Sequence, residues 1–281
     1  HHRVSLSRRQ FLLAGAVGVV AGTAVGCGLF DDDGPERIAY GDAPSQFGDL
    51  YLPSGDPQAT VVLIHGGGWE TSEDLSLVRP MARDLRREGY AVWNVEYRRV
   101  GEAGGGWPGT FEDVGAAIDH VNALADDHPV DPELIVVVGH SAGGTLALWA
   151  AGRDGDVEPR GYLSLAGFTD LEACVQENLL AGACARLLGG TPAEVSRRYQ
   201  DASPLERLPT GRRQSLVHGE DDDIVPVRQS EGYAAAAEAA GDPVTLVTVP
   251  NAGHFQLIDI HHPAYGQVLD QIRTLVSLNP A

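Results

Sequence analysis

The sequence predicts an α/β protein with a doubly wound, mostly parallel sheet. Short apolar runs at residues 60–64 and 135–138 are rich in β-branched residues, which is typical of parallel strands buried on both faces. Segments with the apolar spacing of helices, at 75–88 and 111–124, alternate with strands. Alternation of this kind places helices on both faces of a parallel sheet, with a ligand site over its carboxyl edge.

Length and composition indicate one globular domain over residues 38–281. A chain of 281 residues with a hydrophobic fraction of 43% can bury one complete core, and no internal repeat is visible. Its 39 acidic residues exceed its 20 basic residues, all of them Arg, and give a net charge of −19. This charge disfavours binding to nucleic acid and to anionic lipid surfaces.

The remaining elements can be placed in chain order from the same patterns. Residues 46–53 alternate like an early antiparallel strand. Further strands are expected at 90–97, 160–167, 215–217 and 244–249, and further helices at 227–240 and 265–278.

The N-terminus has the pattern of an export signal. The pair Arg8-Arg9 followed by an apolar stretch over 13–25 resembles a twin-arginine signal, in which the arginines are read by a receptor. The apolar stretch is interrupted by glycines and is short for a bilayer span, so we expect cleavage of residues 1–27. The alternative is a permanent single-span anchor.

The end of this signal resembles a lipobox. Ala24-Val25-Gly26-Cys27 would place Cys27 at the start of the mature chain, where it would be acylated, although a larger aliphatic residue is usual at the position of Ala24. Residues 28–37 are polar and aperiodic, which indicates a flexible tether. We therefore expect export by the twin-arginine route and lipid anchoring on the outer face of a bacterial cytoplasmic membrane, with no other membrane contact.

A candidate nucleophile lies between the strand at 135–138 and the helical run at 146–151. Gly139 to Gly143 fit the pattern G-x-S-x-G with Ser141 at its centre. Glycines on both sides permit a sharp turn that holds the serine in a strained conformation at a helix N-terminus. The alternative is an ordinary strand-to-helix connection.

A second glycine-rich loop, His65 to Trp69, follows the strand at 60–64. Loops of this HGGG type let backbone amides point into a cavity and supply half of an oxyanion hole. We assign the donors to Gly67 and Gly68, with the amide of Ala142 as the other half. His65 is expected to orient or pack rather than to act as a base, and the alternative for the loop is a turn without catalytic meaning.

A base and an acid can be placed at the ends of two later strands. His254 follows a glycine just past the strand at 244–249, where an imidazole could reach Ser141. Asp221, Asp222 and Asp223 follow the strand at 215–217, and a carboxylate there could orient the imidazole. The residues alone leave the choice among the three aspartates open, but the order Ser, Asp, His is typical of one hydrolase arrangement.

The segment 172–201 is predicted to form a small helical cap over the site. Cys174 and Cys184 lie within it, and in an exported protein they could form a disulfide that stabilises the cap by about 2–3 kcal/mol. The alternative is two buried thiols, and a nucleophilic cysteine is not expected beside Ser141. No C-x-x-C or H-E-x-x-H pattern is present, so neither a metal nor another cofactor is indicated.

Taken together, the motifs resemble the α/β-hydrolase superfamily, and in particular its esterase and arylformamidase-like branch. The resemblance covers about residues 45–278 and rests on HGGGW at 65–69, GHSAGG at 139–144, HGEDDDIVP at 218–226 and AGHF at 252–255. In that family the acid occupies the fifth position of HG-x-x-D-x-x-V-P, which implies Asp222 here.

The predicted function is hydrolysis of a carboxylic ester by a Ser-His-Asp acyl-enzyme mechanism, with Ser141, His254 and Asp222 as the triad. The expected partner is a small-molecule ester or amide, since arylformamidase or peptidase-like amide cleavage is the alternative within enzymes. A lipid-tethered binding module with the same fold is the alternative outside enzymes. The sequence leaves open the acyl length, the choice between ester and amide, and the oligomeric state.

Overall fold

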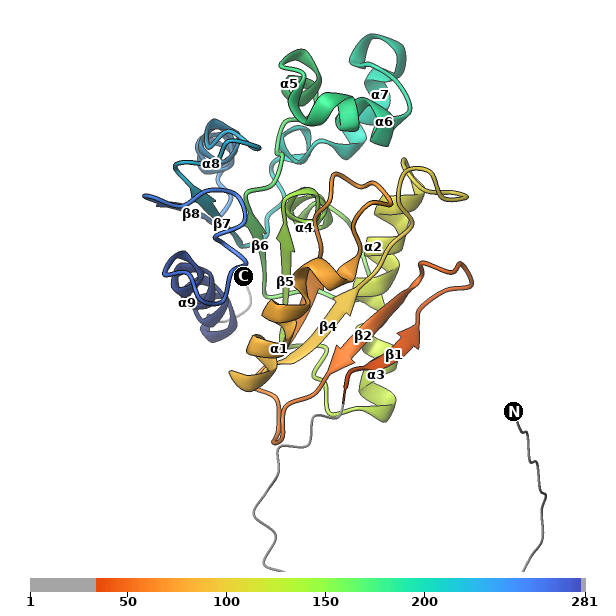
Figure 1. Ribbon diagram of the computed structural model, residues 1–281, viewed down its shortest axis with the longest axis vertical. Helices are drawn as coiled ribbons and strands as arrows, with labels where there is room; N and C mark the ends of the chain where they lie inside the picture. The colour runs from red at the N-terminus through yellow and green to blue at the C-terminus, as the bar shows by residue number, and fades with distance from the viewer. Residues whose placement is uncertain (1–33, 279–281) are drawn as a thin grey trace, which may run out of the picture. The chain divides into compact units, whose positions relative to one another are not determined.

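Residues 34–278 are described by the computed structural model, in which one eight-stranded sheet carries helices on both faces (Figure 1). The predicted signal peptide 1–27, Cys27 and the first part of the tether lie outside the described residues. The strands are β1 (Glu36–Ala39), β2 (Phe47–Tyr51), β3 (Thr60–Ile64), β4 (Ala91–Val95), β5 (Ile135–His140), β6 (Gly161–Leu165), β7 (Gln214–Gly219) and β8 (Val244–Val249).

The helices alternate with these strands. They are α1 (Arg79–Arg87), α2 (Gly109–Asp119), α3 (Val121–Asp127), α4 (Ala142–Ala151), α5 (Leu171–Gln176), α6 (Ala183–Leu188), α7 (Pro192–Ala202), α8 (Arg228–Ala240) and α9 (Ala264–Ser277). Short 3₁₀ turns are η1 (Leu75–Val78), η2 (Leu179–Gly182) and η3 (Pro204–Arg207).

The predicted mostly parallel, doubly wound sheet is confirmed. Its strand order is β1-β2-β4-β3-β5-β6-β7-β8, in which β3 to β8 run parallel to one another and β2 pairs antiparallel with both of its neighbours, β1 and β4. In the register of β3 and β5, Ile64 pairs with Gly139. The loops that begin at His65 and Ser141 therefore leave neighbouring strands at the same edge of the sheet.

Alternate residues of the central strands enter two cores on opposite faces of the sheet. Val62 and Ile64 of β3 belong to a core that includes residues of α2, α3, α4 and the cap. Val61 and Leu63 belong to a second core with residues of α1 and α9. Because both faces are covered, the carboxyl edge is left as the place where loops from several strands meet.

Three predicted boundaries were wrong. Glu36 and Arg37, which we assigned to the tether, belong to β1, a four-residue strand that is mostly exposed and so carries no hydrophobic signal. The predicted helix at 75–88 is divided into η1 and α1, with Pro80 in the first turn of α1. The predicted helix at 111–124 is two helices that meet at His120.

The predicted cap is formed by α5, η2, α6 and α7. These elements occupy residues 171–202 and lie at the top of Figure 1, beyond the carboxyl ends of the parallel strands. The two cap cysteines form a disulfide, so the pairing predicted for an exported protein is present rather than two free thiols.

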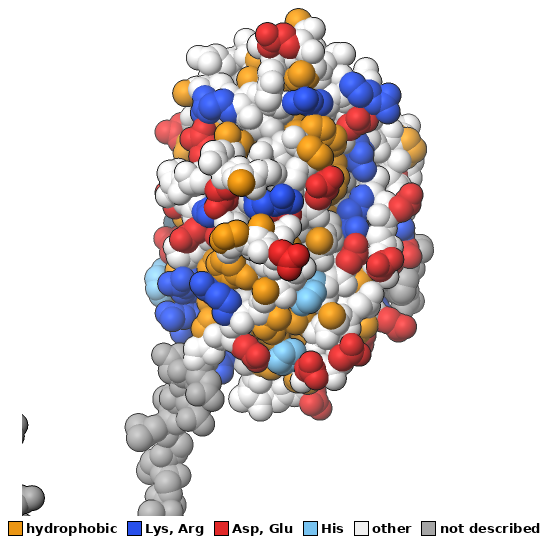
Figure 2. All heavy atoms as spheres, turned by 90° about the vertical axis from the view of Figure 1, so that its right-hand side faces the viewer, with side chains coloured by type: hydrophobic (Ala, Val, Ile, Leu, Met, Phe, Trp, Pro, Cys, Tyr) orange, Lys and Arg blue, Asp and Glu red, His pale blue; other side chains and the backbone are white. Residues whose placement is uncertain are grey.

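On the face drawn in Figure 2, acidic and basic side chains are interspersed, and apolar atoms lie between them. The excess of acid in the sequence is therefore not gathered into one patch on this face. Among the described residues, no helix is both long enough and apolar enough to cross a membrane.

Candidate active site

The candidate nucleophile has the strained backbone that the motif predicts. Ser141 follows β5 directly and has φ 55° and ψ −121°, a left-handed conformation that residues with a Cβ rarely adopt. The tight turn brings the backbone of Gly139 close to that of Gly143. A Cβ at Gly139 would lie 2.0 Å from the carbonyl oxygen of Gly143, so glycine is required at this position. The amide of Ser141 donates to the carbonyl of Leu165 at 2.8 Å, which fixes the turn against β6.

The glycine-rich loop after β3 lies against this turn. A Cβ at Gly143 would lie 2.3 Å from the carbonyl oxygen of Ile64, and one at Gly66 would lie 3.0 Å from the Cβ of Ser141. The indole of Trp69 donates from Nε1 to the carbonyl oxygen of Ala142 at 3.0 Å. The loop and the serine turn are therefore held together by backbone contacts and by one buried tryptophan.

The predicted oxyanion donors lie close to the candidate nucleophile. Gly67 and Gly68 line the same cavity as Ser141 and His254. Within the described chain, neither glycine amide donates to a protein acceptor. The amide of Ala142 is at the first position of α4, where helix amides have no intrahelical partner. These amides are available to hold an oxygen that carries negative charge.

His65 is a buried side chain that contacts the backbone of this loop. Its Nδ1 lies 2.7 Å from the carbonyl oxygen of Gly66 and its Nε2 lies 2.9 Å from Oε1 of Glu96, while its ring stacks on Tyr97. All three of these side chains are buried. This agrees with the expectation that His65 orients the loop, and it identifies Glu96 as the buried carboxylate that orients His65.

The structure distinguishes the three aspartates that the residue pattern left open. Nδ1 of His254 lies 2.7 Å from Oδ2 of Asp222, whose side chain is buried, whereas Asp221 and Asp223 are exposed. The other carboxylate oxygen of Asp222 accepts from the amides of Ile224 and Val225 at 2.9 and 2.8 Å. The neighbours therefore fix the carboxylate in one orientation toward His254.

Electrostatics keeps Asp222 ionised. Burial alone would raise the pKa of Asp222, but hydrogen bonds from His218 and His254 and from the amide of Val225 hold it well below its usual range. His218 lies 3.4 Å from Asp222 and is itself fixed by Ser230 and by the carbonyl of Val225. The ionised carboxylate can orient an imidazole and stabilise its protonated form.

His140 is another buried imidazole beside the site. Burial lowers the pKa of His140 to about 3, so its ring is neutral. Its Nε2 lies 3.0 Å from the carbonyl oxygen of His254 and donates to it, and the two rings are 4.8 Å apart. His140 therefore fixes the backbone that carries His254.

Ser141 and His254 line one cavity of about 230 Å³. Gly67, Gly68 and His140 belong to its wall, and the rest is formed by Glu70, Ser72, Glu73, Leu77, Leu180, Ala183, Ile224 and Phe255. Within the described chain, the Ser141 hydroxyl and His254 form no direct hydrogen bond. Active sites without substrate commonly show such looser geometry, which tightens when substrate binds.

The structure thus gathers six predicted residues at one edge of the sheet: Ser141, Asp222 and His254 with Gly67, Gly68 and Ala142. The residue pattern did not assign roles to Trp69, Glu96, His140 and His218. Three of these four are inside the motifs that were recognised. The contacts of Trp69 and His140 join distant segments, whereas those of His218 are with nearby residues after β7, and all of them become visible only in three dimensions. No group of three metal-ligating side chains is found in residues 34–278.

Comparisons with known proteins identify the family. Residues 49–236, more than half of the chain, match the family model named BD-FAE, and the chain belongs to this family. A solved structure of a truncated carbohydrate esterase from gut microbiota superposes with a TM-score of 0.74 at 23% identity, over 86% of this chain and 95% of that chain. This likeness confirms the α/β-hydrolase fold that the motifs implied.

Two curated relatives come from Mycobacterium tuberculosis. Esterase LipC is 27% identical over 245 residues, which cover 79% of this chain and 60% of LipC. The probable carboxylic ester hydrolase LipM is 26% identical over 208 residues, which cover 68% of this chain and 48% of LipM. The chain thus spans about half to three fifths of the length of these two relatives.

The contacts of Asp222 predict a pH-dependent contribution to stability. We expect Asp222→Asn to lower the free energy of unfolding by about 1–3 kcal/mol at pH 7, because a charged acceptor in a buried network is lost. The pKa of Asp222 is lower in the folded protein than in the unfolded chain, where it is about 3.9. The ionised carboxylate therefore stabilises the fold above that pH, and this stabilisation is lost as the pH falls toward the folded pKa. The difference in the free energy of unfolding between the wild type and Asp222→Asn should therefore have its full size at about pH 5 and be smaller at pH 3.

Urea unfolding at several pH values measures this difference. Asp223→Asn is the matched control, because it makes the same chemical change on an exposed neighbour and should stay within about 0.5 kcal/mol of the wild type. A difference for Asp222→Asn that stays constant between pH 5 and pH 3 would contradict the assignment of an ionised, hydrogen-bonded carboxylate.

Proposed function

We propose that this chain is a serine hydrolase that cleaves a carboxylic ester through an acyl-enzyme. One observation carries the proposal: a strained serine and an aspartate-bound histidine line a single cavity together with the unpartnered amides of Gly67 and Gly68. The names of the relatives LipC and LipM, an esterase and a probable carboxylic ester hydrolase, support the same reaction.

In the proposed reaction, the Oγ of Ser141 attacks the ester carbonyl carbon while Nε2 of His254 accepts the hydroxyl proton. The carbonyl oxygen becomes an oxyanion, which the amides of Gly67, Gly68 and Ala142 hold; each such donor contributes about 3 kcal/mol to lowering the barrier. The C–O bond to the alcohol then breaks and His254 returns the proton to the leaving oxygen. Water, activated by the same imidazole, hydrolyses the acyl-enzyme.

The size of the cavity favours small substrates. A volume of about 230 Å³ lies below the range of about 300–1,000 Å³ that is usual for sites of drug-sized ligands. Leu77, Leu180, Ala183 and Ile224 provide apolar walls beside the serine. We therefore propose an ester with a short acyl chain as the substrate, with p-nitrophenyl acetate as a suitable probe.

Replacement of Ser141 tests the mechanism. Ser141→Ala should reduce kcat/KM for p-nitrophenyl acetate by about 10⁴-fold or more, because the covalent step is lost, while the circular dichroism spectrum stays that of the wild type. Labelling by a fluorophosphonate should be lost in the same variant. Ser196→Ala, which changes an exposed serine of α7, is the control and should keep both the turnover and the label.

Other outcomes separate the alternatives. Faster cleavage of an N-formyl aryl amine or of an aminoacyl anilide than of any ester would assign the site to amide hydrolysis instead. An intact fold without turnover of any of these substrates and without labelling would identify a binding module. Turnover that Ser141→Ala retains would contradict the assigned nucleophile.

We also propose that the chain is exported by the twin-arginine route and held at a membrane by acylated Cys27. The proposal rests on the Arg8-Arg9 pair, the apolar stretch after it and the lipobox-like residues before Cys27. A single acyl chain gives only weak binding, so stable anchoring would require more than one chain on this cysteine.

Expression in a bacterium with an active twin-arginine system tests this localisation. The wild type should incorporate labelled palmitate and sediment with membranes, whereas Cys27→Ser should lose the label and Arg8→Lys/Arg9→Lys should remain in the cytoplasm. Membrane sedimentation of Cys27→Ser equal to that of the wild type would contradict acyl anchoring and would favour a permanent membrane span.

A further inference from the structure

The cap contains a turn with an unfavourable backbone directly above the candidate active site. Asn178, Leu180 and Ala181 have φ values of 53°, 48° and 46°, in the left-handed region that residues with a Cβ rarely adopt. Of these residue types only asparagine is enriched there, so the local sequence does not favour this conformation at Leu180 or Ala181. Contacts with the rest of the protein must therefore maintain the turn.

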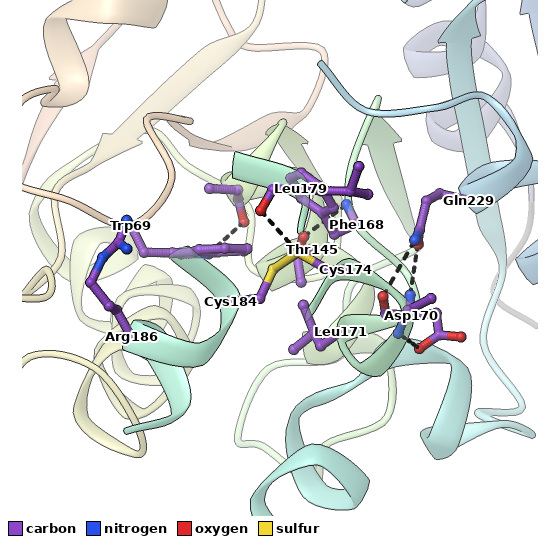
Figure 3. The surroundings of a disulfide bond; sticks show 12 residues. Trp69, Thr145, Phe168, Asp170, Leu171, Cys174, Leu179, Cys184, Arg186 and Gln229 are labelled. Carbon is purple, nitrogen blue, oxygen red and sulfur yellow. Dashed lines mark hydrogen bonds between the residues drawn. A yellow bond between two sulfur atoms is a disulfide. The ribbon is translucent and has the colours of Figure 1, made fainter. Parts of the chain in front are cut away.

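The disulfide closes the chain around this turn. Cys174 lies in α5 and Cys184 in α6, so the bond joins the two helices that flank η2 (Figure 3). Both cysteines are fully buried, and the sulfur of Cys174 lies 4.0 Å from the carbonyl oxygen of Leu179. The cross-link therefore limits how far the turn can open, because its two ends cannot separate.

Arg186 ties the same turn to the loop after β3. Its Nη1 donates to the carbonyl oxygen of Ala181 at 2.8 Å, and its Nε donates to Oε1 of Glu70 at 2.7 Å. Glu70 directly follows Trp69, the tryptophan that contacts the serine turn (Figure 3). One guanidinium thus connects the cap to the segment that carries the proposed oxyanion donors.

These restraints place Leu180 in the wall of the cavity. Leu180 and Ala183 both line the cavity that contains Ser141. A Cβ at Gly68 would lie 3.8 Å from Cδ1 of Leu180 and 3.9 Å from the Cβ of Ala183. The gap between Leu180 and Gly68 of the proposed oxyanion loop is therefore only large enough for a group the size of a methyl. A substrate that extends past Gly68 on this side must meet its side chain.

We propose that Leu180 limits the size of the ester that can bind, and that the Cys174–Cys184 disulfide holds it in this position. This inference rests on the proposed ester hydrolysis and adds the residue that selects the substrate. A leucine in a cavity wall excludes larger groups sterically, whereas alanine at the same site leaves room for about three more carbon atoms. Leu180 is thus a specificity-determining residue, and the disulfide positions it.

Two series of esters test the proposal. One varies the acyl chain of p-nitrophenyl esters from acetate to octanoate, and the other varies the alcohol of acetates from phenyl to 1-naphthyl. For Leu180→Ala we expect the ratio of kcat/KM for the largest to the smallest substrate to rise about tenfold in at least one series. Leu179→Ala is the matched control, since Leu179 is the adjacent half-buried leucine and does not line the cavity.

A second comparison tests the disulfide. Cys174→Ala/Cys184→Ala, and the wild type after reduction, should shift the same ratio in the same direction as Leu180→Ala, with circular dichroism confirming that the sheet remains folded. If the double variant does not fold, the reduced wild type provides the measurement. A ratio unchanged by disulfide removal would overturn the positioning role.

The outcomes also separate this inference from the function on which it rests. If the wild type hydrolyses p-nitrophenyl acetate and Leu180→Ala leaves both ratios unchanged, the specificity role is overturned and ester hydrolysis stands. If the ratio changes equally in Leu179→Ala, the effect is a general loosening of the cap and the role of Leu180 is overturned. If the wild type hydrolyses no ester of either series, the proposed function itself fails.

Discussion

The site depends on one backbone constraint, the left-handed conformation of Ser141 at the junction of β5 and α4. Ser141 lines the cavity in this conformation, which is unfavourable for any residue with a Cβ. It persists because the turn is surrounded by close backbone contacts, with Gly139 against Gly143 and Gly143 against the end of β3. Strain at the nucleophile is therefore maintained by the packing of the central strands β3 and β5, in which every residue is buried.

Around this turn, several buried polar side chains contact backbone carbonyl groups of the loops. Trp69 donates to the carbonyl of Ala142, His140 to that of His254, and His65 lies between the carbonyl of Gly66 and the carboxylate of Glu96. The contacts of Trp69, of His140 and of His65 with Glu96 each join a loop at the end of one strand to another segment of the chain. Because a buried polar group left without its partner is costly, these contacts favour a single arrangement of the loops. The loops that carry the six predicted site residues are thus held in place by contacts within the protein.

Much of this arrangement could be predicted from the sequence, for a physical reason. Ser141 and His254 follow strands that the pattern predicts to be parallel, and the carboxyl ends of parallel strands meet at one edge. The choice of Asp222 required the family resemblance, because three adjacent aspartates have the same chemistry until the amides of Ile224 and Val225 orient one of them. The roles of Trp69, His140 and Glu96 could not be predicted, since each depends on a contact with a distant segment. Strand β1 was missed because four mostly exposed residues have no apolar periodicity.

A structure of the chain inhibited by a small phosphonate ester tests the central claim most directly, because the adduct imitates the tetrahedral intermediate. We expect phosphorus bonded to Oγ of Ser141, with its phosphoryl oxygen about 2.7–3.1 Å from the amide nitrogens of Gly67 or Gly68 and of Ala142. His254 should remain hydrogen-bonded to Asp222 and should direct Nε2 toward the adduct. An adduct on another residue, or a phosphoryl oxygen turned away from these amides, would contradict the claim.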